Sequence, residues 1–198
     1  MRRPPRGGGS IALARERLFL AVPLPKALLP TVRRAQAQLA DIQGVRLLAK
    51  DQLHVTVAFV GEVELSEQES VEEVAKELGQ EPGGEVMMGQ SMLFFPKPAR
   101  PRVVALSLED QADTLLNLHE KAVVGLKLRG VHVEADRRYH PHLTIARLKK
   151  TGSIGRKLEG EPMLFPVRSL CLYRSDLTFG GAEHTELMTV DLAAAGSE

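Results

Sequence analysis

Two segments of the 198-residue chain repeat one pattern, a histidine and a threonine separated by one apolar residue. The pattern occurs as His54-Val55-Thr56-Val57-Ala58 and again as His142-Leu143-Thr144-Ile145-Ala146. Because alternate side chains of a strand share a face, each segment, read as a strand, presents one imidazole and one hydroxyl together. An imidazole, with a pKa of about 6.5, can take up or give a proton near neutral pH, and a hydroxyl can donate to a phosphate oxygen. Two such strands facing each other predict acid–base attack on a phosphodiester without a metal ion.

Other interpretations of these histidines are weaker. A single His-x-Thr occurs by chance on many strands, but two copies that both end in alanine are harder to explain by chance. His140 and His142 would share a strand face, which raises the question of a zinc site. However, no acidic residue lies at ligand spacing, and Cys171 is the only cysteine of the chain. We therefore expect no metal ion and no other cofactor.

The composition excludes several classes of protein. Hydrophobic residues make up 43% and charged residues 26%, which is typical of a folded globular chain. A count of 26 basic against 25 acidic residues argues against a general nucleic-acid coat, and the absence of tryptophan argues against an extended base-stacking platform. No segment approaches the roughly 18 consecutive apolar residues of a membrane span. The single cysteine excludes an internal disulfide, and we expect a cytoplasmic protein.

Hydrophobic periodicity predicts strands and helices in mixed order, and hence an α+β fold. Residues 1–14 are expected to form a flexible tail, residues 15–192 one domain and residues 193–198 a second tail. Ser66 and Glu69 have the spacing of a capping box at the start of a helix. Each half of the chain holds one motif, which indicates two related lobes facing each other across a cleft. The expected strands cover residues 17–22, 53–60, 86–93, 103–108, 131–133, 142–147, 167–173 and 186–192, and the expected helices residues 27–42, 66–78 and 110–128.

The segments around the motifs carry a family resemblance. They read Arg17-Leu18-Phe19-Leu20-Ala21-Val22, Leu53-His54-Val55-Thr56-Val57-Ala58-Phe59-Val60-Gly61-Glu62-Val63, Pro141-His142-Leu143-Thr144-Ile145-Ala146-Arg147 and Leu172-Tyr173-Arg174-Ser175. In residues and order they resemble the 2H phosphoesterases, specifically the bacterial and archaeal RNA 2′,3′-cyclic phosphodiesterases historically called 2′-5′ RNA ligases. The resemblance, over about residues 15 to 192, implies a bilobal α+β fold with two pseudo-symmetric antiparallel sheets flanking a central cleft. It also implies hydrolysis of a ribose 2′,3′-cyclic phosphate to a 2′-phosphate without a metal ion.

The resemblance further implies a role for each residue of the two motifs. His54 and His142 are expected to form the acid–base pair, and Thr56 and Thr144 to hold the phosphate. We prefer His142 as the base that activates water and His54 as the acid that protonates the departing O3′. Because the two motifs are nearly equivalent, the sequence leaves this direction open.

Three further residues are candidates for the site. Arg147 matches the arginine that ends the family's His-x-Thr-x-x-Arg pattern and helps to bind phosphate. Strict alternation would place the Arg147 side chain on the face opposite His142. A strand end or a β-bulge is therefore needed to turn it to the face that carries His142. Strict alternation likewise places the Phe59 side chain on the face opposite His54. Phe59 and Tyr139 are both candidates for substrate contact, and a place in the core is the alternative for each.

The sequence departs from the family's pattern at two places, and it leaves two alternative functions open. Leu47-Leu48 replaces a frequent tryptophan, and His184 replaces a frequent tyrosine, which concerns substrate preference more than chemistry. The implied partner is RNA ending in a 2′,3′-cyclic phosphate, or a small cyclic nucleotide, bound by a monomer without a membrane or an obligate protein partner. The alternatives are reversible joining of RNA halves through 2′-5′ linkages and a non-catalytic nucleotide-binding module.

Overall fold

The strands of the protein pair antiparallel along one continuous path. The computed structural model describes residues 15–135, 138–149, 162–178 and 181–194. Within these residues the strand order is β7-β4-β5-β6-β3-β1-β8-β9, and β2 pairs with β6 beside this path. The strands are β1 Arg15–Pro23, β2 Val45–Leu47, β3 His54–Glu64, β4 Gly84–Phe95, β5 Val103–Glu109, β6 His142–Leu148, β7 Met163–Val167, β8 Ser169–Thr178 and β9 Gly181–Asp191. The helices are α1 Leu29–Ala37, α2 Leu65–Leu78 and α3 Thr114–Leu128, with short 3-10 turns at Lys26–Leu28 and Lys50–Gln52.

Strand β1 lies at the centre of its half of the sheet because it has no polar face to turn to water. It pairs with β3 on one side and with β8 on the other. Residues 18–22 are all buried, on both faces of the strand. A continuous apolar run of this length is typical of a strand covered on both sides. The strand expected at residues 17–22 is thereby confirmed.

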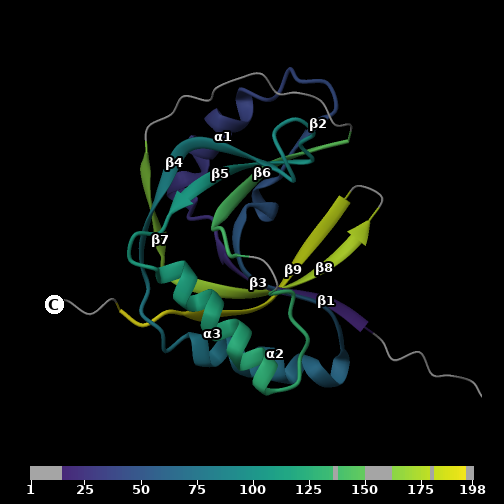
Figure 1. The fold of residues 1–198 in the computed structure, drawn as a ribbon, viewed down its shortest axis with the longest axis vertical. Helices are drawn as coiled ribbons and strands as arrows, with labels where there is room; N and C mark the ends of the chain where they lie inside the picture. Colours follow the sequence, from purple (N-terminus) through teal and green to yellow (C-terminus); the bar gives the residue numbers. More distant parts are fainter. Residues whose placement is uncertain (1–14, 136–137, 150–161, 179–180, 195–198) are drawn as a thin grey trace, which may run out of the picture.

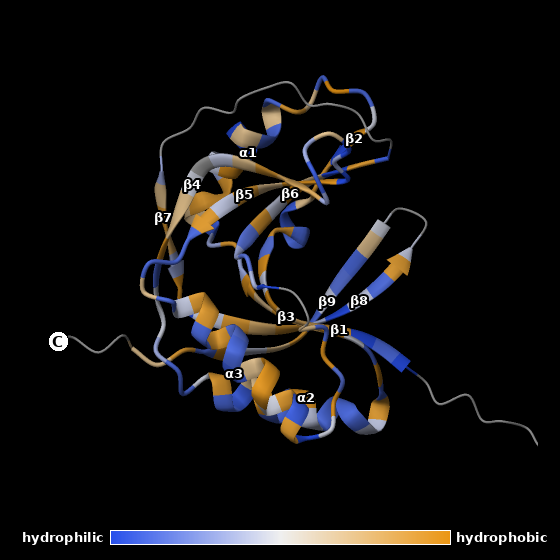
Figure 2. Cartoon of the chain, viewed as in Figure 1, coloured by the Kyte–Doolittle hydropathy of each residue, from blue (hydrophilic) through white to orange (hydrophobic). Residues whose placement is uncertain are grey.

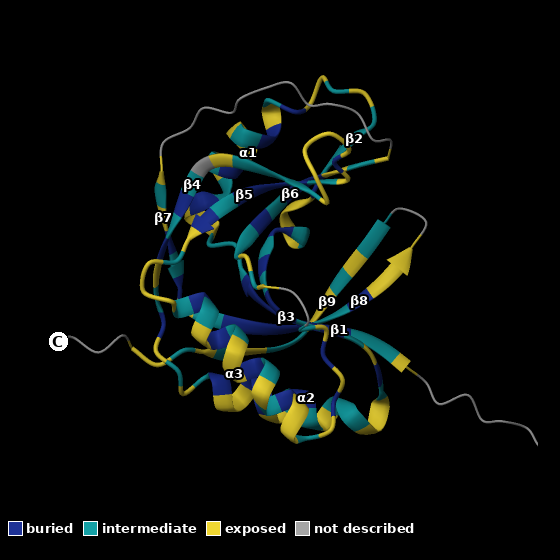
Figure 3. Cartoon of the chain, viewed as in Figure 1, coloured by how far each residue is buried: buried dark blue, intermediate teal, exposed yellow. Residues whose placement is uncertain are grey.

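The helices cover the two halves of the sheet from outside, as Figure 1 shows. Helix α1 contacts β6, whereas α2 and α3 contact each other and β3. Helices α2 and α3 each bury an apolar stripe. Hydrophobic and hydrophilic residues alternate along these helices in Figure 2, and buried and exposed residues alternate in Figure 3. The buried stripe of α3 consists of Leu115, Leu118, Ala122 and Leu126, and that of α2 of Val71, Val74, Ala75 and Leu78.

The two motif-bearing strands join the halves of the sheet. Strands β3 and β6 pair antiparallel through Val55 and Leu143, the middle residues of the two His-x-Thr motifs. The α+β class with an antiparallel sheet is confirmed. The two sheets implied by the family resemblance are linked here into one path of strands, because the motif strands pair directly with each other.

Several sequence expectations need correction. Residues 131–133 form no strand, although Val131 and Val133 are buried, because they pack on the core as part of a connecting segment. Helix α2 begins directly after β3, so that its capping contact runs from the Glu64 amide to the Glu67 carboxylate over 2.8 Å, and not between Ser66 and Glu69. Strand β2 was not expected.

The expected tails have different outcomes. Residues 1–14 lie outside the described part of the chain. Ala193, which we assigned to the second tail, pairs with the loop before β4: its amide donates to the Glu81 carbonyl, and its carbonyl accepts from the Gly83 amide, each over 2.9 Å. None of the described helices is long and apolar enough to cross a membrane.

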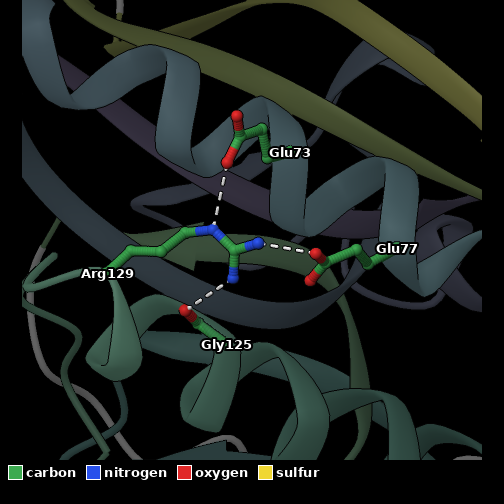
Figure 4. A network of polar contacts seen from close by, with 4 residues as sticks. All are labelled: Glu73, Glu77, Gly125 and Arg129. Carbon is green, nitrogen blue, oxygen red and sulfur yellow. Dashed lines mark hydrogen bonds and ion pairs between the residues drawn. The ribbon is translucent and has the colours of Figure 1, made fainter.

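Helices α2 and α3 are also tied together at the surface (Figure 4). The Arg129 guanidinium, just after α3, donates to Glu73 over 3.2 Å and to Glu77 over 2.6 Å, both on α2. It also donates to the Gly125 carbonyl over 3.2 Å, near the C-terminal end of α3. The two carboxylates raise the pKa of Arg129, which therefore remains charged.

We expect Arg129→Met to lower the urea midpoint of unfolding slightly and to leave the slope unchanged, because exposed ion pairs contribute little. Lys127→Met, an exposed change on the same helix, is the matched control and should leave the midpoint unchanged. A large loss of stability would show that this network, rather than the apolar stripe, holds α3 on the sheet.

Candidate active site

A cleft of about 480 Å³ contains nearly all the residues that the sequence singled out. His54, Thr56, His142 and Thr144 line it, and so do Phe59 and Arg147. Tyr139 is not among its described lining residues. The remaining described lining residues are Arg17, Phe19, Arg46, Leu48, Gln52, Phe95, Val103, Ser175, Leu177, Gly181, Ala182 and His184.

The pairing of β3 with β6 brings the four motif side chains together. Val55 lies directly opposite Leu143, and both are fully buried. Their chain neighbours therefore point to the other face, which is the face of the cleft. Because the pairing is antiparallel, His54 lies toward the Thr144 end of this pair, and Thr56 toward the His142 end. The four side chains therefore line the same cleft.

A β-bulge in each motif strand interrupts the strict alternation of side chains. In β3, Ala58 pairs with Leu20 and Thr56 with Ala21, which leaves Val57 as an extra residue. Both Val57 and Ala58 are buried, and Phe59 then turns to the same face as Thr56. The bulge therefore brings Phe59 to the cleft, whereas the sequence had left a place in the core open.

Strand β6 carries the same irregularity at the equivalent place. Its Ala146 pairs with Val104 of β5 and its Thr144 with Ala105, so that Ile145 is the extra residue. Ile145 and Ala146 are both buried, and Arg147 then lines the cleft. Arg147 in the second motif thus occupies the position that Phe59 occupies in the first.

The carbonyls of the first bulge are bound from α3 and from the segment after it. The Val57 carbonyl accepts a hydrogen bond from Nδ1 of His119 over 2.7 Å. The Tyr139 hydroxyl donates to the Thr56 carbonyl over 2.9 Å. The Tyr139 and His119 rings stack with centroids 4.3 Å apart. These contacts satisfy backbone groups that a bulge takes out of the regular ladder.

Tyr139 has the core position that the sequence left open beside a substrate contact. Its ring packs against the core beside His119, and its hydroxyl is used by the backbone of β3. Burial raises the pKa of Tyr139, so that the hydroxyl keeps the proton that it donates. The structure places Tyr139 behind the motif strand and outside the cleft, and we do not retain it as a substrate contact.

The second bulge is held by a buried glutamine of α1. Nε2 of Gln36 donates to the Ile145 carbonyl over 2.8 Å and to the Leu48 carbonyl over 2.9 Å. The Leu48 amide also donates to the Ile145 carbonyl, over 3.0 Å. Nη1 of Arg33 donates to Oε1 of Gln36 over 2.7 Å, which orients the amide. Gln36 thus binds the carbonyl of the extra residue in β6, as His119 binds the carbonyl of the extra residue in β3.

The hydrogen bonds of the two imidazoles leave one ring nitrogen of His142 for chemistry. Nδ1 of His142 lies 2.7 Å from the His140 carbonyl, to which it donates, so that Nε2 is the acceptor of the neutral ring. The backbone of Gln52 is the equivalent hydrogen-bond partner of His54. In both motifs the partner is thus the residue two positions earlier in the chain.

The surroundings of both imidazoles favour the neutral form. Burial, followed by His184, Arg147 and His142, lowers the pKa of His54 to about 3. Burial also lowers the pKa of His142. No three His, Cys, Asp or Glu side chains gather as a metal-ligand group within the described ranges. The expectation that the chemistry needs no metal stays a prediction.

The family model described as the 2′-5′ RNA ligase superfamily matches residues 24–178. The chain belongs to this superfamily. An RNA 2′,3′-cyclic phosphodiesterase of Methanothermobacter thermautotrophicus is 32% identical over 182 residues, covering 86% of this chain and 96% of that protein. One of Archaeoglobus fulgidus is 29% identical over 176 residues, covering 86% of this chain and 97% of that protein.

Solved structures show the same superfamily fold. A crystal structure of a Thermus thermophilus protein superposes with a TM-score of 0.76 at 28% identity, over 90% of this chain and 98% of that one. The apo form of Escherichia coli LigT superposes with the same TM-score of 0.76 at 24% identity, over 90% of this chain and 98% of that one. The family resemblance drawn from the two motifs is therefore confirmed.

Three residues that contact the motifs of this superfamily member were not identified as site residues from the sequence. The imidazole of His184 lies with its ring centre 5.3 Å from that of His54, and Phe19 lies 4.8 Å from His54. These rings exclude water from His54 and so contribute to its lowered pKa. In the sequence, Gln36 has the position of a surface residue on an amphipathic helix. Of the three residues, only His184 stood out in the sequence, because it occupies a place where the family frequently has tyrosine.

Gln36→Leu tests the bracing of the second bulge. The change removes the donor that two buried carbonyls share, and we expect it to lower the free energy of unfolding by about 1–3 kcal/mol. Urea unfolding of purified protein measures this. Gln68→Leu removes an amide that bonds Glu72 within α2 and is the control, with a much smaller effect expected. Equal effects of the two substitutions would contradict a special role for Gln36.

Proposed function

We propose that the protein hydrolyses 2′,3′-cyclic phosphate ends of RNA to 2′-phosphates by means of its two His-x-Thr motifs. The observation that carries the proposal is the pairing of β3 with β6, in which the two imidazoles and two hydroxyls of the motifs line one cleft. Relatives of nearly full length named RNA 2′,3′-cyclic phosphodiesterase support the same activity.

In the proposed reaction one imidazole takes a proton from water while the water oxygen bonds to phosphorus. The bond from phosphorus to O3′ breaks, and the second imidazole gives O3′ its proton, which leaves the phosphate on O2′. The Thr56 and Thr144 hydroxyls donate to the non-bridging oxygens, where negative charge increases in the transition state. The Arg147 guanidinium adds a positive charge beside the same oxygens.

We keep His142 as the base and His54 as the acid. Nε2 of His142 is the unprotonated nitrogen of the neutral ring, as a base requires. The strongly lowered pKa of His54 makes its imidazolium a strong proton donor, and the negative charge of a bound phosphate favours protonation of that ring.

His54→Ala and His142→Ala should each reduce the rate of hydrolysis of a 2′,3′-cyclic phosphate by about 100-fold to 10,000-fold, because each removes one proton transfer. His132→Ala, at an exposed histidine outside the cleft, is the matched control and should leave the rate unchanged. Thermal unfolding would confirm that all three variants fold. A folded His54 or His142 variant with near-normal turnover would refute the mechanism.

A substrate in which sulfur replaces the bridging O3′ separates the acid from the base. A thiolate leaves without protonation, since the pKa of a thiol is about 8.5. We expect His54→Ala to hydrolyse this substrate at a rate close to that of the unmodified protein, while His142→Ala remains slow. The opposite pattern would show that His142 is the acid and His54 the base.

The lowered pKa values also predict the pH dependence. Because kcat/KM reports the ionisations of the free enzyme, we expect a bell-shaped profile with both apparent pKa values below 6.5 and the lower one near 3. The value of kcat/KM should therefore fall as the pH rises from 6 to 8. Arg147→Gln removes a nearby positive charge, so that the acidic limb should move to higher pH. A profile centred above pH 7 would contradict this account.

A further inference from the structure

The end of the β8–β9 hairpin stands apart from the rest of the sheet (Figure 1). Strand β1 pairs with β8 only from Leu18 to Ala21, so that this pairing ends where Leu18 meets Arg174. Beyond Arg174, β8 pairs with β9 alone among the described strands, as far as Thr178 opposite Gly181. The end of the hairpin is therefore a two-stranded ribbon with two distinct faces.

The two faces of this ribbon differ in polarity. Directly opposite residues of an antiparallel pair share a face, so that the register assigns each residue to one of them. The face that lines the cleft, which we call the hairpin wall, carries the opposite pairs Ser175–His184 and Leu177–Ala182. The residues of the other face do not line the cleft, and they are the opposite pairs Arg174–Thr185 and Asp176–Glu183. The acidic and arginine side chains of the ribbon thus lie on the face away from the cleft.

Leu177 is the most unusual residue of the hairpin wall, because it is large, apolar and 74% exposed. The other exposed large apolar residues of the described part of the chain lie outside the cleft, and they are Leu65, Val124, Leu128 and Leu164. Single exposed apolar residues are common on protein surfaces, so that exposure alone does not indicate a binding site. In the wall of a cleft, however, an exposed apolar side chain offers a ligand an area that both remove from water on binding.

Leu177 also borders a neighbouring hollow, but the charges of that hollow make it a poor place for an apolar group. The hollow is lined by Arg15, Glu16, Arg17, Glu62, Arg174, Ser175, Asp176 and Leu177. In it Arg174 pairs with Glu16 over 3.3 Å and with Asp176 over 3.1 Å. Taking paired charges out of water is costly. An apolar group that covers Leu177 is therefore favoured on the side of the cleft.

The hairpin wall is fixed beside His54. The ring centre of His184 lies 5.3 Å from that of His54. Nε2 of Gln52 donates to the Ala182 carbonyl over 2.6 Å. The backbone of the same Gln52 is the hydrogen-bond partner of His54, so that one residue contacts both the hairpin and the imidazole. The hairpin wall therefore lies at the His54 end of the site.

The proposed reaction determines on which side of the phosphate the nucleoside lies. In an in-line displacement the attacking and leaving oxygens are on opposite sides of phosphorus. The attacking water lies at the base, His142, and O3′ lies at the acid, His54. Because the ribose carries O3′, the nucleoside extends on the His54 side, which is the side of the hairpin wall. Phe95 of β4, whose ring centre lies 4.9 Å from that of His142, is on the side of the water.

We propose that the hairpin wall binds the nucleoside that carries the reacting phosphate, with Leu177 packed against the face of its base. The proposal rests on the proposed function, because that function defines the phosphate between the motifs and the direction of the displacement. An apolar side chain on the face of a base contacts none of its hydrogen-bonding groups. The hairpin wall therefore favours any nucleoside over a ribose phosphate without a base.

Two substrates test the proposal: adenosine 2′,3′-cyclic phosphate and methyl riboside 2′,3′-cyclic phosphate, in which a methyl group replaces the base. We expect kcat/KM to be higher for the adenosine compound by about tenfold or more, because the base buries apolar surface on Leu177. Leu177→Ser should reduce the ratio of the two values by about threefold to tenfold. Leu164→Ser, at a leucine of β7 that is 53% exposed and lies outside the cleft, is the matched control and should leave the ratio unchanged. Thermal unfolding would confirm that both variants fold.

The ratio separates a contact with the base from an effect on the chemistry, because both substrates carry the same reacting group. A ratio that falls in Leu177→Ser and not in Leu164→Ser supports the proposal. A ratio near one in the unmodified protein, a ratio that Leu177→Ser retains, or an equal fall in Leu164→Ser overturns it. A ratio that falls in Phe95→Leu but not in Leu177→Ser would place the base on the side of His142, and this would also overturn it.

If the protein hydrolyses neither compound, the proposed function fails, and calorimetry then tests the hairpin wall separately. The two ligands are adenosine 2′-phosphate and methyl riboside 2′-phosphate. Tighter binding of adenosine 2′-phosphate, with the preference reduced in Leu177→Ser, would support the hairpin wall as a nucleoside site. Equal binding of the two ligands, or a preference that Leu177→Ser retains, would refute it.

Discussion

A single pair of apolar residues determines the geometry on which the site depends. Val55 and Leu143 lie opposite each other where β3 meets β6, and both are fully buried. Because side chains alternate along a strand, burial of these two residues forces their neighbours, two histidines and two threonines, to the opposite face. A shift of the register by one residue would bury the imidazoles and expose the apolar residues, which the hydrophobic effect opposes. The core thereby fixes the relative position of the polar groups.

The two bulges extend this arrangement from four side chains to six. Each bulge places two consecutive apolar residues in the core and returns the next residue, Phe59 or Arg147, to the cleft. A bulge disrupts the ladder of hydrogen bonds, and unpaired buried carbonyls would be costly. His119 of α3 and Gln36 of α1 bind the carbonyls of the two extra residues. These two side chains, far from each other in sequence, therefore stabilise equivalent irregularities in the two motifs.

Local patterns in the sequence predicted the parts of the site that depend on local geometry. The His-x-Thr repeats predicted two strands with a polar face. The alternation of side chains predicted that a strand end or a bulge turns Arg147 to the cleft, and the register of β5 and β6 shows a bulge. The sequence left Tyr139 open between the cleft and the core, because its position depends on the packing of α3 against β3, which no local pattern encodes. Gln36 escaped notice for the same reason. Its role depends on Ile145, which lies about a hundred residues later in the chain.

The central claim is that the two imidazoles of the cleft open a 2′,3′-cyclic phosphate at the bond to O3′. Product analysis on a defined oligonucleotide ending in a 2′,3′-cyclic phosphate tests it most directly, by separating the 2′-phosphate from the 3′-phosphate after complete reaction. The account predicts the 2′-phosphate as the product. A 3′-phosphate would show that the substrate lies the other way round between the motifs, and no reaction at all would contradict the assignment of the cleft as an active site.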